Sequence, residues 1–263
     1  MPNILVVIDP EEAEHHGLRR IREVPQTDIS FKVDLYIENA ASAKKAESFI
    51  DELEKKNQWL KALVQPLQQE GYNIVTEVIA FDRLYESIIQ SAHRFKADFV
   101  FKPLRQHGAL SRALFTSTDW NLIRFCPSPL LLVSHNDSVR GKPVIAAVDV
   151  ASRDEAHEEL NRIVLEEARV FASVLGSEIH LVNAYSIAAV AGTGAVSDPL
   201  AYQISRDKHD EQLKEAIEFA GGYGIAPEAV HLREGAADLV VNEYATEVDA
   251  GVIVLGTVAR SGI

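Results

Sequence analysis

The chain has 263 residues, of which 47% are apolar and 25% are charged, and its formal net charge is −13. This composition is typical of a globular protein, and the length allows two modest α/β domains or one large one. The negative charge disfavours nucleic acid as a partner, the single cysteine excludes an intrachain disulfide, and no apolar run approaches the ~20 residues that span a membrane.

The N-terminal half alternates strand patterns with helix patterns. It opens directly on a β-branched run, residues 3–9 (NILVVID), which leaves no room for a signal peptide, so we expect a cytoplasmic protein. Residues 11–24 carry only a short, weak helix pattern. A long amphipathic pattern then runs from Ala46 to Leu67 and ends before Gly71. The other elements expected in this half are strands 31–37, 74–79, 98–102 and 129–133 and helices 84–95 and 117–124.

The C-terminal half repeats the first. Residues 143–149 (PVIAAVD) match the opening strand at a displacement of 140 residues, and an amphipathic helix pattern follows until Gly176. The further expected elements are strands 178–184, 229–233 and 251–255 and helices 213–220 and 236–248. Strands that alternate with helices form parallel β–α–β units, so we predict an α/β protein with two tandem, doubly wound, Rossmann-like parallel sheets. The polar stretch 134–142 divides it into domains 1–137 and 138–263.

The two halves differ at their ends. After its fourth strand, the first half continues with the helix pattern 117–124 and the strand pattern 129–133, and the second half has no counterpart of either. We therefore interpret the second domain as incomplete at its C-terminus, with its last helix and strand missing. Because an uncovered edge strand invites pairing with another chain, we also consider a homodimer formed through edge strands.

Three stretches of the sequence carry a family resemblance. The opening strand of each half ends in an aspartate, Asp9 and Asp149; residues 255–262 read LGTVARSG; and residues 115–129 contain Thr-Asp-Trp and Cys-Pro-Ser-Pro. Together these stretches resemble the universal stress protein family in its tandem form, with two family domains in one chain. The last stretch is similar to the E-type tandem members of Gram-negative bacteria. The resemblance covers nearly the whole chain and implies a stress-response function.

The resemblance also implies which domain could bind a nucleotide. Family members that bind ATP hold its phosphates on a loop of glycine, two residues, glycine, nine residues, and glycine with serine or threonine, because glycines let backbone N–H groups approach the anion. In the first half these positions hold Pro103, Gln106 and Thr116, so we expect no cofactor in the first domain. In the second half they hold Gly256 and Ala259, and the third position lies beyond the chain.

Carried over residue by residue, the resemblance assigns contacts with ATP or ADP to the second half. Asp149 is expected near the ribose or the adenine, and the backbone of Ala184 is expected to border the base. The residues expected to face the phosphates are Gly256, Thr257, Arg260 and Gly262. Ala259 departs from the pattern, and a positive φ there would cost it about 1 kcal/mol or more.

Other residues that could carry chemistry have simpler interpretations. No histidine pair has the i, i+4 spacing with a glutamate that indicates zinc, so we expect no metal. Ser117 and Ser128 have no recognisable base and orienting group, which argues against a serine nucleophile. Residues 186–201, rich in Ala and Gly, are too long for an ordinary β–α connection and are interpreted as a lid over the ligand edge.

Several side chains are expected to be structural. Cys126 is interpreted as a small buried apolar residue, and Trp59 and Trp120 as packing residues between the halves or in a pocket wall. The histidines expected to be exposed on helices or loops are His15, His16, His107, His135, His157 and His209.

These observations leave three hypotheses for the function. The first is a nucleotide-responsive binding module with at most slow ATP hydrolysis. The alternative within the same family is a scaffold that binds no nucleotide and whose first half takes an apolar ligand or a protein partner. An enzyme on a related α/β fold comes last, because the sequence shows no activated nucleophile, metal set or acid–base pair.

Overall fold

The computed structural model describes residues 2–12, 14–26, 28–39, 46–105, 115–135, 138–152, 154–185 and 199–257. The chain divides into two compact units, and the division falls between residues 137 and 138. Each unit is built on its own parallel sheet. Among the described residues, no helix is long and apolar enough to cross a membrane.

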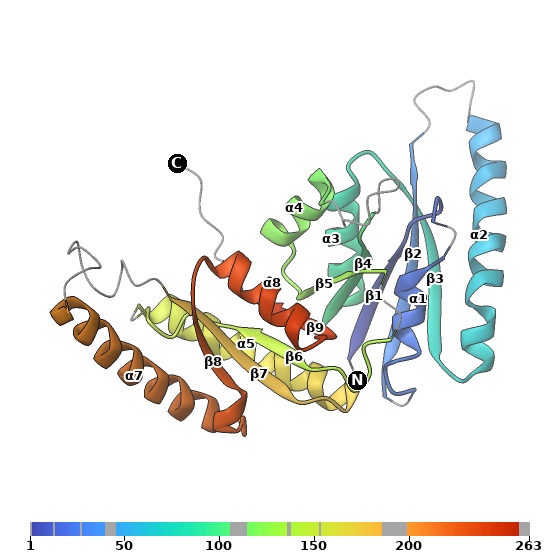
Figure 1. Cartoon of the computed structure of the whole chain (residues 1–263). Coiled ribbons are helices and arrows are strands. Elements are labelled where there is room, and N and C mark those ends of the chain that lie inside the picture. Colours follow the sequence, from blue (N-terminus) through green and yellow to red (C-terminus); the bar gives the residue numbers. More distant parts are fainter. Residues whose placement is uncertain are drawn as a thin grey trace. The chain divides into compact units, whose positions relative to one another are not determined.

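The first unit is a five-stranded parallel sheet with two helices on each face (Figure 1). Its elements in chain order are β1 (Asn3–Ile8), α1 (His16–Ile21), β2 (Ser30–Glu38), α2 (Ala46–Gln69), β3 (Asn73–Phe81), α3 (Leu84–Phe95), β4 (Phe99–Pro103), α4 (Ser117–Phe125) and β5 (Leu130–Val133). The strand order β3-β2-β1-β4-β5 reverses direction at β1, which places the switch point between β1 and β4.

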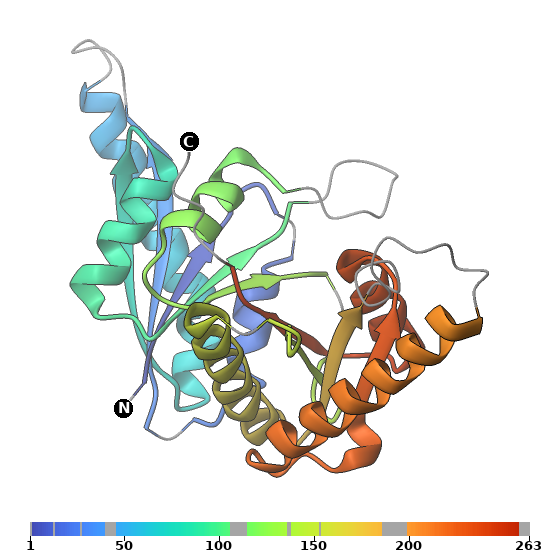
Figure 2. The ribbon, with the colours of Figure 1, turned by 90° about the vertical axis from the view of Figure 1, so that its left-hand side faces the viewer.

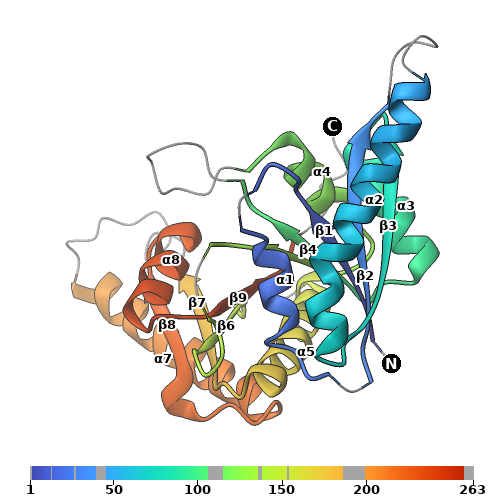
Figure 3. The same ribbon diagram turned by 90° about the vertical axis from the view of Figure 1, so that its right-hand side faces the viewer.

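The side chains of β1 divide the core of the first unit into two layers. Leu5 and Val7 pack against Ile88 of α3 and Leu122 of α4. Val6 points the other way, toward α1 and α2, which lie together on the near face of this sheet in Figure 3. Because successive residues of a strand point to opposite faces, a strand covered on both faces must be apolar throughout, as this run is.

The second unit has a four-stranded parallel sheet in the order β8-β7-β6-β9. Its elements are β6 (Val144–Ala147), α5 (Glu155–Leu175), β7 (Ile179–Tyr185), α7 (Pro199–Gly221), the 3₁₀ turn η2 (Pro227–Ala229), β8 (Val230–Glu234), α8 (Ala237–Glu247) and β9 (Val252–Leu255). Figure 2 shows α5, in olive, and α7, in orange, on one face of this sheet. The opposite face is covered by α8, through Val240 and Tyr244 against Ile145 and Val182.

The observed elements confirm the predicted α/β fold with two parallel sheets, the second of them smaller. Among the described residues, the second unit has no counterpart of α4 or β5. The consequence is visible at equivalent positions of the fourth strands. Val100 of β4 is 0% exposed because it packs against Leu122 of α4, whereas Ile253 of β9, at the equivalent register, is 40% exposed.

One predicted helix is shorter in the structure than its pattern, and another, 213–220, is the last part of the longer helix α7. The weak pattern at 11–24 forms only the six-residue helix α1, because the segment lacks an apolar stripe long enough to hold a longer helix on the sheet. The proposed lid at 186–201 lies outside the described residues except for its last three, which form the first turn of α7.

Candidate functional site

Four of the candidate nucleotide residues lie at one edge of the second sheet. Asp149 follows β6 by two residues, Ala184 is the last but one residue of β7, and Gly256 and Thr257 come directly after β9 (Figure 1). Ala147 pairs with both Val182 and Leu255, so the parallel register brings residues 149, 184 and 257 to the same level. Arg260 and Gly262, like Ala259, lie outside the described residues. The carboxyl ends of parallel strands, where these four residues lie, are where α/β folds bind ligands.

Two buried asparagines hold the loop that carries Asp149. The side chain of Asn161, on α5, accepts a hydrogen bond from the backbone N–H of Asp149 at 3.0 Å and donates one to its carbonyl at 2.7 Å. The carboxamide oxygen of Asn183, on β7, accepts from the N–H of Val150 at 2.9 Å. The Asp149 carboxylate itself is exposed and accepts from the N–H of Ala151. The loop backbone is thus fixed on two sides while its acid faces solvent.

Gly256 is required by packing. A Cβ on Gly256 would lie 2.5 Å from Cγ of Leu160, on α5, which is far inside van der Waals contact. Glycine at this position therefore lets α5 approach the end of β9, and it serves the fold whether or not a phosphate binds there. Thr257, the next residue, is exposed.

The equivalent edge of the first unit is filled by its own charges. Asp9, the counterpart of Asp149, accepts a hydrogen bond from the N–H of Glu11 and forms an ion pair with Arg105, whose Nε lies 2.7 Å from Oδ2. Asp9 thus acts in a turn. Glu12 lies beside it, and both of its carboxyl oxygens are buried without a hydrogen-bond partner among the described residues. Burial and the neighbouring Asp9 raise the pKa of Glu12 to about 7, against the opposing charges of Lys102 and Arg105.

A carboxylate of the chain occupies the N-terminus of α4. Asp119 is completely buried and accepts hydrogen bonds from the backbone N–H and the hydroxyl of Thr116, at 2.6 and 2.7 Å. Thr116 in turn accepts from the N–H of Asp119, which completes a capping box. Nζ of Lys102, at the end of β4, forms an ion pair with Asp119 at 2.7 Å. The helix end that would receive a phosphate already holds an anion with its own counter-charge.

Sequence reasoning did not find Asn161, Asn183, Lys102 or Asp119. The pattern Thr116-Ser-Thr-Asp119 is a capping signal, and it could have pointed to Asp119. The other three carry no local signal, because their partners are backbone groups or side chains distant in the sequence.

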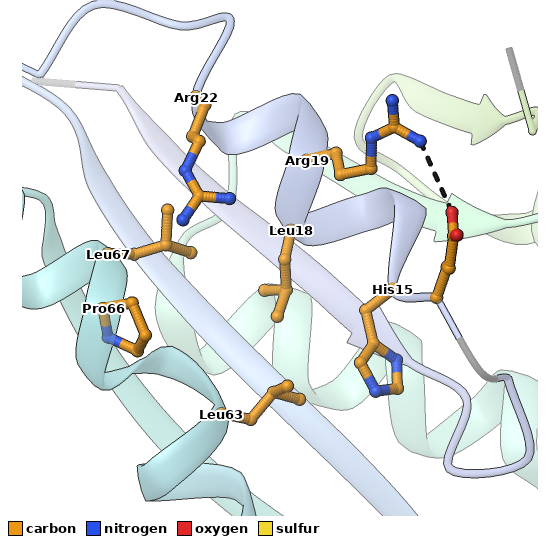
Figure 4. Close-up of a pocket in the computed structure, with 8 residues that line it drawn as sticks. His15, Leu18, Arg19, Arg22, Leu63, Pro66 and Leu67 are labelled. Carbon is orange, nitrogen blue, oxygen red and sulfur yellow. Dashed lines mark ion pairs between the residues drawn. The ribbon is translucent and has the colours of Figure 1, made fainter. Parts of the chain in front are cut away.

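The first unit also has a groove between α1 and α2, with a volume of about 490 Å³ (Figure 4). Its floor is apolar and is formed by Leu18, Leu63, Pro66 and Leu67. Figure 4 shows Arg19, Arg22 and His15 around it, with Arg19 paired to Glu14. Trp59 packs edge-on against His15 near this groove, so this tryptophan lies close to a pocket wall.

Other sequence expectations have mixed outcomes. His16 was expected to be exposed but is buried, because its ring packs against that of His135 with 4.2 Å between centroids; burial lowers its pKa. Cys126 is half-buried, and burial raises the pKa of its thiol. Trp120 is 58% exposed and contacts Phe115. His107 lies outside the described residues.

Metal-binding side chains are scattered in the part of the chain that the structure describes. No three histidine, cysteine, aspartate or glutamate side chains there lie close enough together to hold a metal ion.

Comparison with known proteins places both units in one family. A model of the "Universal stress protein family" matches residues 1–134 and again residues 142–263. "Universal stress protein E" of Escherichia coli K12 is 29% identical over 277 aligned residues, which cover 99% of this chain and 86% of that protein. The homologue from Haemophilus influenzae is 26% identical and is covered to 89%.

Solved structures show the same fold. The crystal structure of a functionally unknown protein from Pseudomonas aeruginosa PAO1 aligns with a TM-score of 0.78 at 26% identity, covering 99% of this chain and 83% of that one. A universal stress protein from Archaeoglobus fulgidus aligns with a TM-score of 0.67 at 17% identity, covering 95% of this chain and 85% of its own; at that identity the likeness concerns the fold alone.

Proposed function

Because this chain belongs to the universal stress protein family and carries two copies of its domain, we propose that it is a stress-response protein that acts as a nucleotide-responsive binding module. The membership confirms the tandem resemblance seen in the sequence. In our proposal ATP or ADP binds to the second unit, and the first unit binds no nucleotide.

The observation that carries this proposal is the meeting of Asp149, Ala184, Gly256 and Thr257 at one edge of the second sheet. In the proposed complex the Asp149 carboxylate accepts a hydrogen bond from the ribose or the adenine, and the backbone at Ala184 borders the base. The phosphates face Gly256 and Thr257, together with Arg260 and Gly262. The Asn161 and Asn183 hydrogen bonds support this role, because they hold the Asp149 loop in place before a ligand arrives.

The contrast with the first unit supports the choice of the second. In the first unit Asp119 and Lys102 form a buried pair where a phosphate and its counter-charge would lie, and Pro103 has no N–H to donate. At the position equivalent to Lys102 the second unit has Leu255, and it has no Asp119 counterpart among the described residues. Among the described residues, a phosphate at this edge therefore displaces no buried ion pair of the kind that Lys102 and Asp119 form.

The proposed activity is binding, with at most slow ATP hydrolysis. The sequence shows no activated nucleophile or acid–base pair, and the Asp149 carboxylate at this edge is exposed and bonded to the N–H of Ala151. A bound nucleotide would therefore stay intact for longer than it does in an ordinary hydrolase. This suits a protein whose conformation depends on whether nucleotide is bound.

The first test is to identify the ligand and then to weaken its site. The protein, purified without added nucleotide and denatured, is expected to release ATP or ADP in a mass spectrum, and the Arg260→Ala variant is expected to come out empty. In titration calorimetry with Mg-ATP, Asp149→Ala is expected to bind about tenfold more weakly, since a hydrogen bond to a charged group contributes about 1.5 kcal/mol or more.

Asp9→Ala is the matched control, because Asp9 is the counterpart of Asp149 in the unit that is proposed to bind no nucleotide. It is expected to leave the affinity for Mg-ATP unchanged. If the wild-type protein releases no nucleotide and gives no heat with Mg-ATP, the proposal is wrong. Equal losses in Asp9→Ala and Asp149→Ala would contradict the assignment to the second unit.

The groove between α1 and α2 favours one alternative, a scaffold that binds an apolar ligand in the first unit. Its floor of Leu18, Leu63 and Leu67 suits an aliphatic group. In that case the same mass spectrum would contain an apolar molecule in place of a nucleotide, and Leu63→Glu would abolish it while Asp149→Ala would not.

A further inference from the structure

Three titratable side chains meet beneath α8, in the layer where the second unit is otherwise apolar. His180 of β7, His231 of β8 and Tyr244 of α8 bring their rings together, with 5.7 Å between the two imidazole centroids and 4.5 Å from His231 to Tyr244. Tyr244 is only 2% exposed. We call these three residues the α8 joint, because their rings lie together in the contact between α8 and the sheet.

Both ring nitrogens of His180 contact polar groups. Its Nδ1 lies 2.5 Å from the hydroxyl of Tyr244, and its Nε2 lies 3.0 Å from a carboxylate oxygen of Glu178. The imidazole of His180 therefore links the buried hydroxyl of Tyr244 on α8 to the sheet.

His231 is placed so that a proton on it is unfavourable. Its Nε2 is buried and has no hydrogen-bond partner among the described residues. The guanidinium of Arg233 lies 4.5 Å from the Tyr244 ring and is paired with Glu247, and Glu243 lies near it. Burial lowers the pKa of His231, the neighbouring His180 and Arg233 lower it further, and Glu247 opposes this.

The first unit has a polar cluster at the equivalent place. In the first sheet Val7 pairs with Asp34, and in the second sheet the equivalent Ala147 pairs with Val182. Asp34 and Val182 are therefore equivalent positions. Two residues before them, Lys32 is the counterpart of His180. Asp34 pairs with Glu77 as Val182 pairs with His231, so Glu77 corresponds to His231. Ser91 of α3 takes the place of Tyr244, at the offset of 153 residues that also relates β4 to β9.

That cluster differs in chemistry and responds to acid in the opposite sense. Lys32 contacts Glu77 and Ser91, and Ser91 and Tyr36 donate to the buried Asp34. Burial raises the pKa of Asp34 in spite of these bonds. A carboxyl whose pKa is raised on folding costs stability as the pH rises, so acid strengthens the contact at Asp34. A histidine whose pKa is lowered on folding costs stability as the pH falls below about 6.5.

We propose that the α8 joint is a pH-sensitive contact, which holds α8 on the second sheet while His231 is neutral and loosens it when His231 takes up a proton in mild acid. A proton on Nε2 of His231 adds a buried charge beside Arg233 and His180. The new N–H group also has no hydrogen-bond acceptor among the described residues. Ile145 and Val182 of the sheet also pack against Tyr244, and because they are apolar they cannot stabilise the added charge. Since α8 leads into β9, loosening reaches the strand that ends at Gly256.

Hydrogen–deuterium exchange on the full chain tests this without any ligand. After correction for intrinsic rates, protection of α8 (residues 237–247) is expected to fall about fivefold or more between pH 7.5 and pH 5.5. Protection of α3 (residues 84–95), the equivalent helix, is expected to stay constant or to rise. An equal loss in both helices, or no loss in α8, would overturn the proposal.

Variants assign the effect to the joint. His231→Phe keeps a ring of similar size that cannot take a proton, so protection of α8 is expected to become independent of pH in this range. His157→Gln, on α5, removes a histidine outside the joint and is expected to leave the acid response intact. Persistence of the response in His231→Phe would refute the assignment.

An NMR titration of the wild-type imidazoles covers the case in which His231→Phe does not fold. His231 is expected to titrate below free histidine and to shift together with the Tyr244 ring signals. Titration of His231 at or above the value of free histidine would overturn the proposal.

Discussion

At the scale of single residues, the same position in the repeat has different partners in the two units. Asp9 and Asp149 both follow the first strand of a sheet, but Asp9 is neutralised by Arg105, while Asp149 is exposed on a backbone held by Asn161 and Asn183. The partners decide the role, since an ion-paired carboxylate has already made the contact that a ligand would need.

Glu12 provides a prediction at this scale. Its raised pKa, about 7, means that the folded unit binds a proton that the unfolded chain releases near pH 4.5, so stability is lost as the pH rises between these values and the loss is complete above pH 7. Glu12→Gln is therefore expected to raise the free energy of unfolding by about 1–3 kcal/mol at pH 8 and to have little effect at pH 4. Urea denaturation at the two pH values measures this.

Glu11→Gln is the control, because this neighbouring carboxylate is exposed. It is expected to change stability by less than about 0.5 kcal/mol at either pH. A gain for Glu12→Gln that does not depend on pH would show that desolvation of the charge is not its cause.

At the scale of elements, the N-terminus of α4, where an anion could bind, is occupied by the carboxylate of Asp119 from the same helix. Its capping box orders the Thr116–Asp119 turn, and Lys102 of β4 neutralises the buried carboxylate. The pair ties the helix to the strand that precedes it, across the segment that in ATP-binding members carries the phosphate loop. Side chains of the unit itself thus supply both the anion and its counter-charge at this helix end.

Lys102→Met is expected to destabilise the first unit by about 3–5 kcal/mol, because it leaves Asp119 buried without a counter-charge. Adding Asp119→Asn is expected to restore much of the loss, since asparagine can still cap the helix and carries no charge. Lys142→Met, which breaks the exposed pair with Asp249, is the matched control and is expected to cost less than about 1 kcal/mol. Chemical denaturation of the four proteins measures these effects, and a double variant as unstable as Lys102→Met would contradict this account.

At the scale of the whole molecule, the repeat gives equivalent positions different burial. Val100 and Ile253 occupy the same register of their sheets, but only Val100 is covered, by α4. The second unit therefore presents an apolar strand surface, formed by Ile253 and Leu255, that the first unit keeps inside.

Serine substitutions at these two positions are expected to differ in cost. Val100→Ser leaves a cavity and a hydroxyl in a dry layer, and we expect it to lower the free energy of unfolding by about 3 kcal/mol. Ile253→Ser is expected to cost about 1 kcal/mol or less, because the side chain is 40% exposed. Urea denaturation of both variants checks this; a cost for Ile253→Ser equal to that for Val100→Ser would mean that another surface covers β9 in solution.

By itself, the sequence determined the order of strands and helices, the repeat and the family. These features rest on local periodicity, such as the uninterrupted apolar run of β1, and on capping residues such as Gly176, whose positive φ ends α5. It also indicated which strand ends carry candidate residues, because strands of a parallel sheet share one carboxyl edge.

Only the tertiary structure decided which of those residues have partners. His16 is buried by the ring of His135, far away in the sequence. Asp119 is paired with a lysine on the preceding strand, and Gly256 is required by the close approach of Leu160 on another helix. The α8 joint likewise joins residues from two strands and a helix. Such contacts are set by sheet register and helix docking, which arise from packing of the whole unit and leave no periodic signal in the chain.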